Sequence, residues 1–361
     1  MRLLTIMAAV LAGLALLTAA GLAATRGLIR LARRRAPALG RFVTVDGVRL
    51  HLRNEGEGPT VLLIHGAKGS LYDHELELAP LLRDRYRVIT VDRPGSGYSE
   101  RVPDGGERAP DGGERGLDGG VRRRSEPPVD GGSSRESGSP FVQADLLHEL
   151  LRELRAAPAI VLGHSAGAPV ALALALRHPD DVAGLVTAAG YTHAVRPLGT
   201  ALARLLRARL LGRLFRAALL APAVALAGPF VLRRIAAPER APRAYARAAL
   251  ALNYDPARSA GDAEDVAAVE RDLRLLAPEY PRITQPLIAV HGSEDRVLWP
   301  QQSERLVDAV PGAELRPIAG AGHLLPVTRA AELAAAVDGV AAREARGCTT
   351  NEVRDGALDA V

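Results

Sequence analysis

The stretch "VLGHSAGAPV" at residues 161–170 decides how the rest of the sequence is interpreted. It places Ser165 between Gly163 and Gly167, after an apolar run and before the helical pattern "AGAPVALALALRH". A sharp turn from a strand into a helix exposes one side chain above a sheet, and flanking glycines let two backbones pass closely. The five-residue pattern alone is weak evidence, because glycine, alanine and serine are common in this chain. Its place between a strand and a helix is what predicts a nucleophilic serine.

The surrounding sequence alternates short apolar runs with helical patterns. Residues 41–56 predict a β-hairpin around Asp46 and Gly47, a strong two-residue turn signal. Buried strands are expected at 61–64, 86–92, 159–163, 182–190, 286–292 and 313–320, and helices near 72–83, 142–156, 166–178, 301–310 and 328–343. Near-continuous apolar strands are typical of a sheet that is covered on both faces. The alternation predicts an α/β fold with a doubly wound, mainly parallel sheet, whose ligands bind at the carboxyl ends of the strands.

Two later residues supply the partners that a nucleophilic serine needs. Asp295 in "HGSEDRVLWP" and His323 in "IAGAGHLLP" each follow a predicted strand, at the same sheet edge as Ser165. A serine hydroxyl requires a general base, and the base requires an acid that orients it. Asp295 alone also fits a cap of the helix that starts near Pro300, and a lone loop histidine is more often structural. The three in this order predict a catalytic triad.

The loop "IHGAKGS" at residues 64–70 follows an early strand and supplies a fourth element. Acyl transfer creates an oxyanion that needs backbone N–H donors. The N–H groups of Ala67 and Ala166 are predicted to be these donors. The full phosphate-loop pattern is absent, and Lys68 is expected to be solvated rather than catalytic.

Five motifs together carry a family resemblance: "HGAKGS", "DRPGSGYSE", "GHSAG", "HGSEDRVLWP" and "GAGHLLP". In order and spacing they are similar to the α/β-hydrolase superfamily, in its branch of serine esterases, cofactor-free haloperoxidases and C–C hydrolases. The resemblance covers residues 41–345 apart from 101–140. It implies an α/β-hydrolase fold in which Ser165 is the nucleophile, His323 the base and Asp295 the acid, without a cofactor or a metal.

The departures from the family pattern narrow the chemistry. Serine at position 165 argues against epoxide hydrolases and haloalkane dehalogenases, which resemble this branch but use aspartate there. Ala166 stands where many relatives carry a bulky residue, which predicts more space at the bottom of the site. The turn at residues 92–99 is expected to be structural.

The N-terminal segment predicts a membrane helix. Residues 3–25 are 23 residues without a charge, and about 20 apolar residues cross a bilayer, whereas a signal peptide has a shorter apolar stretch and a clear cleavage site. We therefore expect an uncleaved anchor in preference to a cleaved signal or a buried soluble helix. Five arginines follow this stretch and only Arg2 and the amino terminus precede it. The positive-inside rule then favours a cytoplasmic catalytic domain.

Composition limits the partners. The chain has 361 residues and a formal charge of +5, and the six arginines of residues 1–38 leave the rest at −1. A nearly neutral body does not favour nucleic acid. The single cysteine, Cys348, rules out an intrachain disulfide, and we expect no metal site built on cysteine.

Two further segments interrupt the core. Residues 101–140 contain "PDGGER" twice and almost no large apolar residue, which predicts a disordered surface insert rather than a solenoid. Residues 191–281 lie where the family places a helical lid.

The predicted organisation is a membrane anchor with its basic flank (1–38), a first core part (39–190), a helical cap (191–281), a second core part (282–345) and a flexible tail (346–361).

The cap is basic and apolar. Residues 196–247 contain eleven arginines against one acid, Glu239. The apolar run 217–232 is broken by two prolines and a glycine, and its 16 residues are short for a membrane span. Two interpretations stay open: a solvated helix on an apolar lid wall, or a basic lid that lies on anionic membrane. The apolar composition favours an acyl or aromatic substrate over a sugar or a phosphate.

These observations favour a membrane-anchored serine hydrolase that cleaves a carboxylic ester or a related acyl compound through an acyl-enzyme. Its expected partners are a small apolar acyl or ester substrate and membrane lipid. The same triad also serves perhydrolysis and C–C bond hydrolysis, and the motifs do not separate these reactions. A non-catalytic, hydrolase-like lipid binder or membrane scaffold is the third hypothesis, but pure binding does not require all three triad residues.

Overall fold

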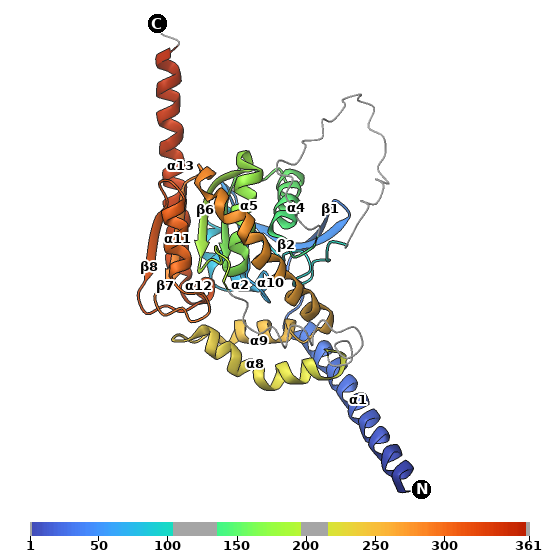
Figure 1. The fold of residues 1–361 in the computed structure, drawn as a ribbon. Coiled ribbons are helices and arrows are strands. Elements are labelled where there is room, and N and C mark those ends of the chain that lie inside the picture. The colour runs from blue at the N-terminus through green and yellow to red at the C-terminus, as the bar shows by residue number, and fades with distance from the viewer. Residues whose placement is uncertain (1, 104–135, 196–215, 359–361) are drawn as a thin grey trace, which may run out of the picture.

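An eight-stranded sheet forms the centre of the computed structural model, which describes residues 2–103, 136–195 and 216–358 (Figure 1). The strands are β1 (Arg41–Val45), β2 (Val48–Glu55), β3 (Thr60–Ile64), β4 (Arg87–Val91), β5 (Ala159–His164), β6 (Val182–Ala188), β7 (Leu287–Gly292) and β8 (Glu314–Ile318). Their order is β1-β2-β4-β3-β5-β6-β7-β8. The pairs β1·β2 and β2·β4 are antiparallel and the remaining five are parallel. The prediction of a mainly parallel sheet is confirmed.

Each apolar run expected to be a strand lies in one. The hairpin turn falls at Asp46 and Gly47, whose φ angles of 49° and 78° are both positive, as a two-residue hairpin turn requires. The expectation of a buried strand over 313–320 is wrong for β8, whose residues are partly buried or exposed. Because β8 is the last strand in the sheet order, it has a strand neighbour on one side only.

Helices cover both faces of the sheet. The described helices are α1 (Arg2–Arg35), α2 (Tyr72–Glu75), α3 (Leu78–Leu82), α4 (Pro140–Glu153), α5 (Ala168–Arg177), α8 (Ala221–Ala236), α9 (Arg243–Leu252), α10 (Pro256–Leu276), α11 (Gln301–Ala309), α12 (Leu325–Thr328) and α13 (Ala330–Leu358). Short helical turns are η1 (Ser165–Gly167), η2 (Pro179–Asp181), η3 (Arg216–Leu220) and η4 (Ala277–Arg282). The helix expected over 72–83 is divided into α2 and α3, and α13 continues into the segment for which a flexible tail is predicted.

Alternation along the strands divides the core between these faces. Leu62 and Ile64 of β3 belong to an apolar cluster with residues of α4 and α5. Val61 and Leu63 of the same strand belong to a second cluster with residues of α3 and α13. The strands are apolar along their length because both of their faces are buried.

The cap lies between β6 and β7 and its described part is helical: η3, α8, α9, α10 and η4. Residues 196–215, with several of the cap arginines, lie outside the described residues, and so do residues 104–135 of the insert predicted at 101–140. The prediction is wrong for the end of that insert, because Ser137 and Ser139 are buried and Pro140 begins α4. The expectation that the run at 217–232 is too short for a span is corrected. Residues 217–236 form one helical stretch that is long and apolar enough to cross a membrane, although Pro229 lies inside it.

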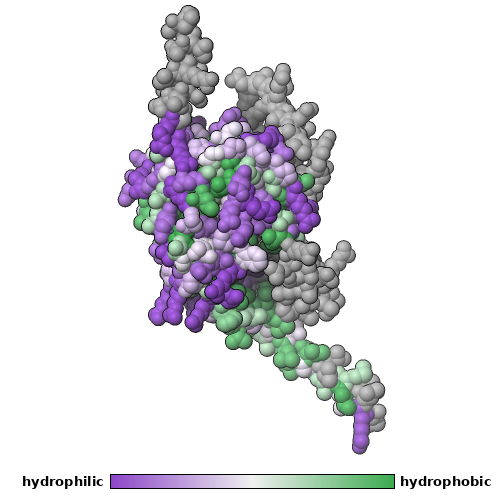
Figure 2. All heavy atoms as spheres, turned by 60° about the vertical axis from the view of Figure 1, so that its left-hand side comes forward, coloured by the Kyte–Doolittle hydropathy of each residue, from purple (hydrophilic) through white to green (hydrophobic). Residues whose placement is uncertain are grey.

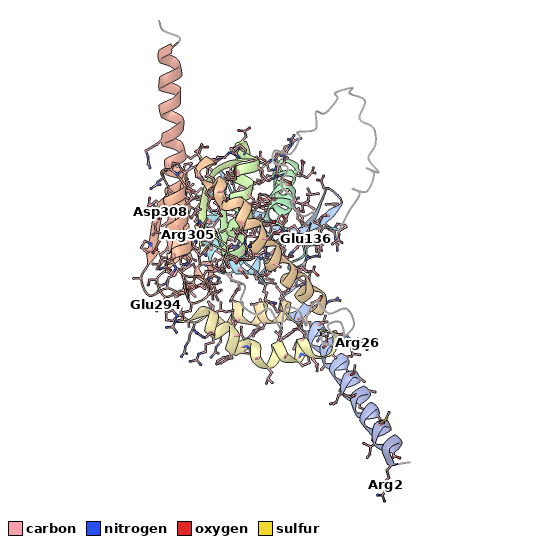
Figure 3. All side chains as sticks on the ribbon, viewed as in Figure 1. Arg2, Arg26, Glu136, Glu294, Arg305 and Asp308 are labelled. Atoms are coloured by element: carbon pink, nitrogen blue, oxygen red, sulfur yellow. The ribbon has the colours of Figure 1, made fainter. Side chains whose placement is uncertain are left out.

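Helix α1 projects from the body (Figure 1). Arg2 stands at its free end and Arg26 beside the cap, so the first part of the uncharged stretch between them extends outward (Figure 3). Its last residues already contact the cap, since a Cβ added to Gly21 would lie 2.4 Å from the Ala218 oxygen. Residues 5–35 are the second candidate membrane span, and none of its most apolar window is buried. Figure 2 shows hydrophobic surface on the lower side of the body that continues along the projecting helix.

The last turns of α1 pack into the body. Ala32 and Ala36 share an apolar cluster with Leu71 and Tyr72, and with residues of α9. The Tyr72 hydroxyl donates to the Pro37 carbonyl at 2.7 Å. A second tyrosine hydroxyl, from residue 98, donates to the Ala36 carbonyl at 2.5 Å. The end of the helix is therefore part of the packing between cap and core.

This packing predicts different effects for two deletions. Removing residues 1–17 keeps the packed turns, including Gly21 beside Ala218 and the buried Thr25, so the melting temperature of the body should stay within about 2 °C. Removing residues 1–38 deletes two buried alanines and two hydrogen-bond acceptors, and should lower it by about 5–10 °C. Thermal unfolding of both proteins measures the difference. Equal melting temperatures would mean that the packed turns contribute nothing.

Candidate active site

The turn from β5 into α5 holds Ser165 in a conformation that the surrounding backbone enforces. Ser165 has a φ of +50°, which is uncommon for a residue with a side chain. A Cβ added to Gly163 would lie 2.5 Å from the Gly167 oxygen, and one added to Gly167 would lie 2.4 Å from the Ile64 oxygen. No side chain fits at either glycine, so both are needed for the turn. The Tyr191 N–H also donates to the Ser165 carbonyl at 3.0 Å.

The structure brings Ser165, His323 and Asp295 together. The Nε2 atom of His323 lies 3.0 Å from the Ser165 Oγ, and its Nδ1 atom lies 2.7 Å from the Asp295 Oδ2. All three residues are nearly buried, with exposed fractions of 9% for Ser165 and 4% for each of the others. Each follows a different parallel strand, β5, β7 or β8, at its carboxyl end. A serine, an imidazole and a carboxylate at hydrogen-bond distance form the arrangement of a serine nucleophile.

Asp295 is held as an anion. Its Oδ1 accepts the N–H groups of Val297 and Leu298 at 2.8 and 3.0 Å. Burial opposes its charge, but hydrogen bonds from His291 and His323 hold the pKa of Asp295 well below its usual value. The carboxylate binds this turn and His323 rather than capping α11, which begins at Gln301.

His164 is a neighbour of the triad that sequence reasoning missed. Its Nε2–H donates to the His323 carbonyl at 3.0 Å, and the two rings lie 5.1 Å apart. Burial, and then the proximity of His323, lower the pKa of His164 well below its usual value, so the ring is neutral. The only signal in the sequence is its place beside Ser165 in the glycine-flanked motif.

The loop at residues 65–70 contains the predicted oxyanion donor Ala67 and is called the oxyanion loop below. Three hydrogen bonds to one carbonyl hold it in place. The Gly66 oxygen accepts the His65 Nδ1–H at 2.8 Å and the Arg93 Nη2–H at 3.3 Å. It also accepts the Gly69 N–H at 3.3 Å. In a planar trans peptide the next N–H points opposite to the carbonyl. The Ala67 N–H is therefore directed away from this buried cluster.

Both predicted oxyanion donors belong to segments that flank Ser165. A Cβ added to Gly66 would lie 3.0 Å from the Ser165 Cβ, so the oxyanion loop runs directly beside the serine. Ala166 is the second residue of the turn η1 that leads into α5, where backbone N–H groups lack helical partners. His65 and Arg93, which hold the loop, were also missed, because their role depends on contacts between β3 and β4.

The remaining predicted residues take structural or solvent-exposed roles. Lys68 is exposed and borders a small open pocket between the oxyanion loop, Ser96 and the cap. The turn at 92–99 is built around Asp92, which accepts the Leu71 and Tyr98 N–H groups at 2.7 Å each. Among the residues that the structure describes, no group of three or more His, Cys, Asp or Glu side chains is arranged to hold a metal ion.

Comparison with known proteins identifies the family. A family model described as the alpha/beta hydrolase fold matches residues 59–330. The 2-hydroxymuconate semialdehyde hydrolase of Pseudomonas putida is 26% identical over 324 residues, which cover 85% of this chain and 95% of that protein. The chain belongs to the α/β-hydrolase family and is a hydrolase of this fold.

Solved structures agree on the fold. The enol-lactonase from Burkholderia xenovorans LB400 is 21% identical with a TM-score of 0.60, and covers 84% of this chain and all of that one. A bacterial membrane phospholipase A is 22% identical with a TM-score of 0.57, and covers 93% of this chain and 97% of that one.

Asp73 lies under the oxyanion loop and is 5% exposed. Its Oδ1 accepts the Ser70 N–H at 3.4 Å, and a Cβ added to Gly69 would lie 2.3 Å from its Oδ2. Burial outweighs the hydrogen bonds from Ser70 and Tyr245 and raises the pKa of Asp73 to about 7.

This raised pKa predicts a pH-dependent stability. The buried carboxyl is favoured when protonated, so its contribution is present below pH 4 and is lost as pH rises through about 7. Between pH 5 and pH 8 the wild-type protein should lose stability relative to Asp73→Asn, by up to about 2.5 kcal/mol. Denaturant unfolding of both proteins at the two pH values measures this. The same stability difference at both pH values would contradict the raised pKa.

Proposed function

We propose that the protein is a serine hydrolase that cleaves a carboxylic ester or a related acyl compound through an acyl-enzyme. The observation that carries the proposal is the continuous chain of hydrogen-bond distances from the Ser165 Oγ through His323 to Asp295. Two further features support the proposal. The turn between Gly163 and Gly167 and the hydrogen-bonded oxyanion loop both hold backbone groups in fixed positions beside Ser165.

The proposed reaction has two halves, acylation and deacylation, and the same catalytic groups act in both. His323 takes the Ser165 proton while the Oγ attacks the carbonyl carbon, and the carbonyl electron pair moves onto the oxygen. The Ala67 and Ala166 N–H groups stabilise this oxyanion. His323 then protonates the leaving alcohol as its C–O bond breaks, which leaves the acyl group on Ser165. A water molecule, deprotonated by His323, then attacks the acyl carbon; the bond to the Ser165 Oγ breaks, His323 returns the proton to that oxygen, and the acid is released. Asp295 stays ionised and stabilises the imidazolium.

C–C bond hydrolysis is the second candidate reaction. The relative from Pseudomonas putida is named for a semialdehyde substrate rather than an ester. The same triad serves ester hydrolysis, C–C hydrolysis and perhydrolysis, so a panel of substrates must distinguish them. Fast turnover of dienone-type acids together with slow turnover of esters would favour the second candidate.

A substitution of Ser165 tests the nucleophile. Ser165→Ala should lower kcat on short p-nitrophenyl esters by about 10³-fold or more, because no covalent intermediate can form. Ser96→Ala is a matched control, since Ser96 is also buried and its Oγ has no hydrogen-bond partner within the described chain. The control should retain activity within about twofold. Full activity of Ser165→Ala would end the proposal.

We further propose that α1 anchors the enzyme in a membrane. Residues 3–25 make a helix about 34 Å long, which matches a hydrocarbon core of about 30 Å. Among its described side chains, Ile6, Leu14, Leu16 and Leu17 are each more than half accessible. An exposed apolar helix of this length is costly in water and stable in lipid.

Helix α8 is proposed to lie on the same membrane. Leu226 is 87% and Phe230 75% exposed, and two arginines, Arg233 and Arg234, stand in its last turn. An apolar face beside cations suits an anionic lipid surface. Because Glu239, just after α8, is bonded to the catalytic body, the helix is interpreted as resting on the bilayer rather than crossing it.

Tryptophan quenching tests this contact in the full-length protein. The chain has one tryptophan, Trp299, so Phe230→Trp in a Trp299→Phe background places the sole indole on α8. In anionic vesicles that contain brominated lipids, its fluorescence should fall by about half or more. Leu275→Trp in the same background is the control, because Leu275 is also exposed but lies at the far end of α10. Equal quenching at both positions would refute docking by α8.

A further inference from the structure

The cap contacts the histidine loop, defined as residues 319–324, through a carboxylate, through its backbone and through apolar packing. Glu239 lies between α8 and α9, and its Oε2 accepts the Gly322 N–H at 3.1 Å. Gly322 immediately precedes His323, and a Cβ added to it would lie 2.4 Å from the Ala237 oxygen. The same carboxylate accepts the Arg329 Nε–H at 2.6 Å through its Oε1. The cap backbone and Glu239 therefore both contact Gly322, the residue before the candidate base.

The oxyanion loop is contacted from the cap as well. The Tyr245 hydroxyl on α9 is hydrogen-bonded to Asp73, which lies under this loop. The Asn253 Nδ2–H donates to the Lys68 carbonyl at 3.1 Å. Tyr245 is 4% exposed and also packs with Leu324, the residue after the candidate base. One helix of the cap thus reaches both loops that border Ser165.

We propose that Glu239, Tyr245 and Asn253 are positioning residues, through which the cap sets the geometry of the histidine loop and the oxyanion loop. The inference rests on the proposed serine hydrolase function. It goes beyond that function because it assigns the cap a role in the chemical step, separate from covering the substrate.

A physical argument supports this role. Loops move more than strands and helices, yet proton transfer needs the base within hydrogen-bond distance of the nucleophile. A misplacement of about 1 Å costs a rate factor of about 10². A carboxylate that binds the Gly322 N–H makes a stronger bond than a neutral acceptor does. Loss of this bond should lower kcat and leave substrate binding nearly unchanged.

Kinetics of the full-length protein on a p-nitrophenyl ester test Glu239. Glu239→Ala should lower kcat by about 10–100-fold with KM within about twofold. Glu239→Gln retains a carbonyl acceptor for the Gly322 N–H and should restore kcat to within about threefold. Arg329→Met is the matched control, because it removes the cation from Glu239 but leaves the Gly322 bond. Its kcat should stay within about threefold even if its melting temperature falls.

Two tyrosine substitutions test the contact between the cap and the oxyanion loop. Tyr245→Phe removes only the hydroxyl that binds Asp73 and should lower kcat by about fivefold to tenfold at unchanged KM. Tyr254→Phe alters another buried tyrosine of the cap, in the cluster around α1, and should stay within about twofold.

The outcomes separate this inference from the proposed function. If wild-type turnover is abolished by Ser165→Ala but Glu239→Ala keeps its kcat, the positioning role is wrong and the hydrolase proposal stands. The positioning role is also wrong if Arg329→Met loses as much kcat as Glu239→Ala. If wild-type turnover does not depend on Ser165, both proposals fail together.

Discussion

The close backbone approach around Ser165 is the constraint on which the rest of the structure depends. Two glycines let β5 turn into α5 within van der Waals limits, and the serine between them takes a positive φ. That turn fixes the direction of the Ser165 Oγ, so the candidate base and acid must lie near this one position. Parallel strands do this naturally, because their carboxyl ends meet at one edge of the sheet. Asp295 and His323 arrive there from β7 and β8.

The cap and helix α1 are extensions of this arrangement rather than separate attachments. Helix α9 packs against the end of α1 on one side and bears Tyr245 and, just beyond its end, Asn253 on the other. The apolar surface of α8 and the projecting part of α1 lie on the same side of the body (Figure 2). A membrane that holds α1 and α8 would therefore also constrain the elements that border Ser165. On the proposed membrane contact, the lipid surface and the chemical step would belong to one connected set of contacts.

Sequence patterns predicted what depends on local order along the chain. Apolar runs located the strands, the Asp46-Gly47 pair located the hairpin turn, and the order of Ser165, Asp295 and His323 located the candidate triad. What sequence reasoning missed depends on contacts across the fold. His164 donates a hydrogen bond to a carbonyl in the loop after β8, the edge position of β8 follows from strand order, and α8 continues as a helix through Pro229.

The central claim is that Ser165 is the nucleophile, and covalent labelling tests it most directly. A fluorophosphonate forms a stable adduct with a serine that an adjacent base activates. Digestion and mass spectrometry then identify the modified residue. The account predicts one adduct, on the peptide that contains Ser165, with labelling that is lost when His323 is replaced by alanine. An adduct on another serine, or no adduct on a folded protein, would contradict it.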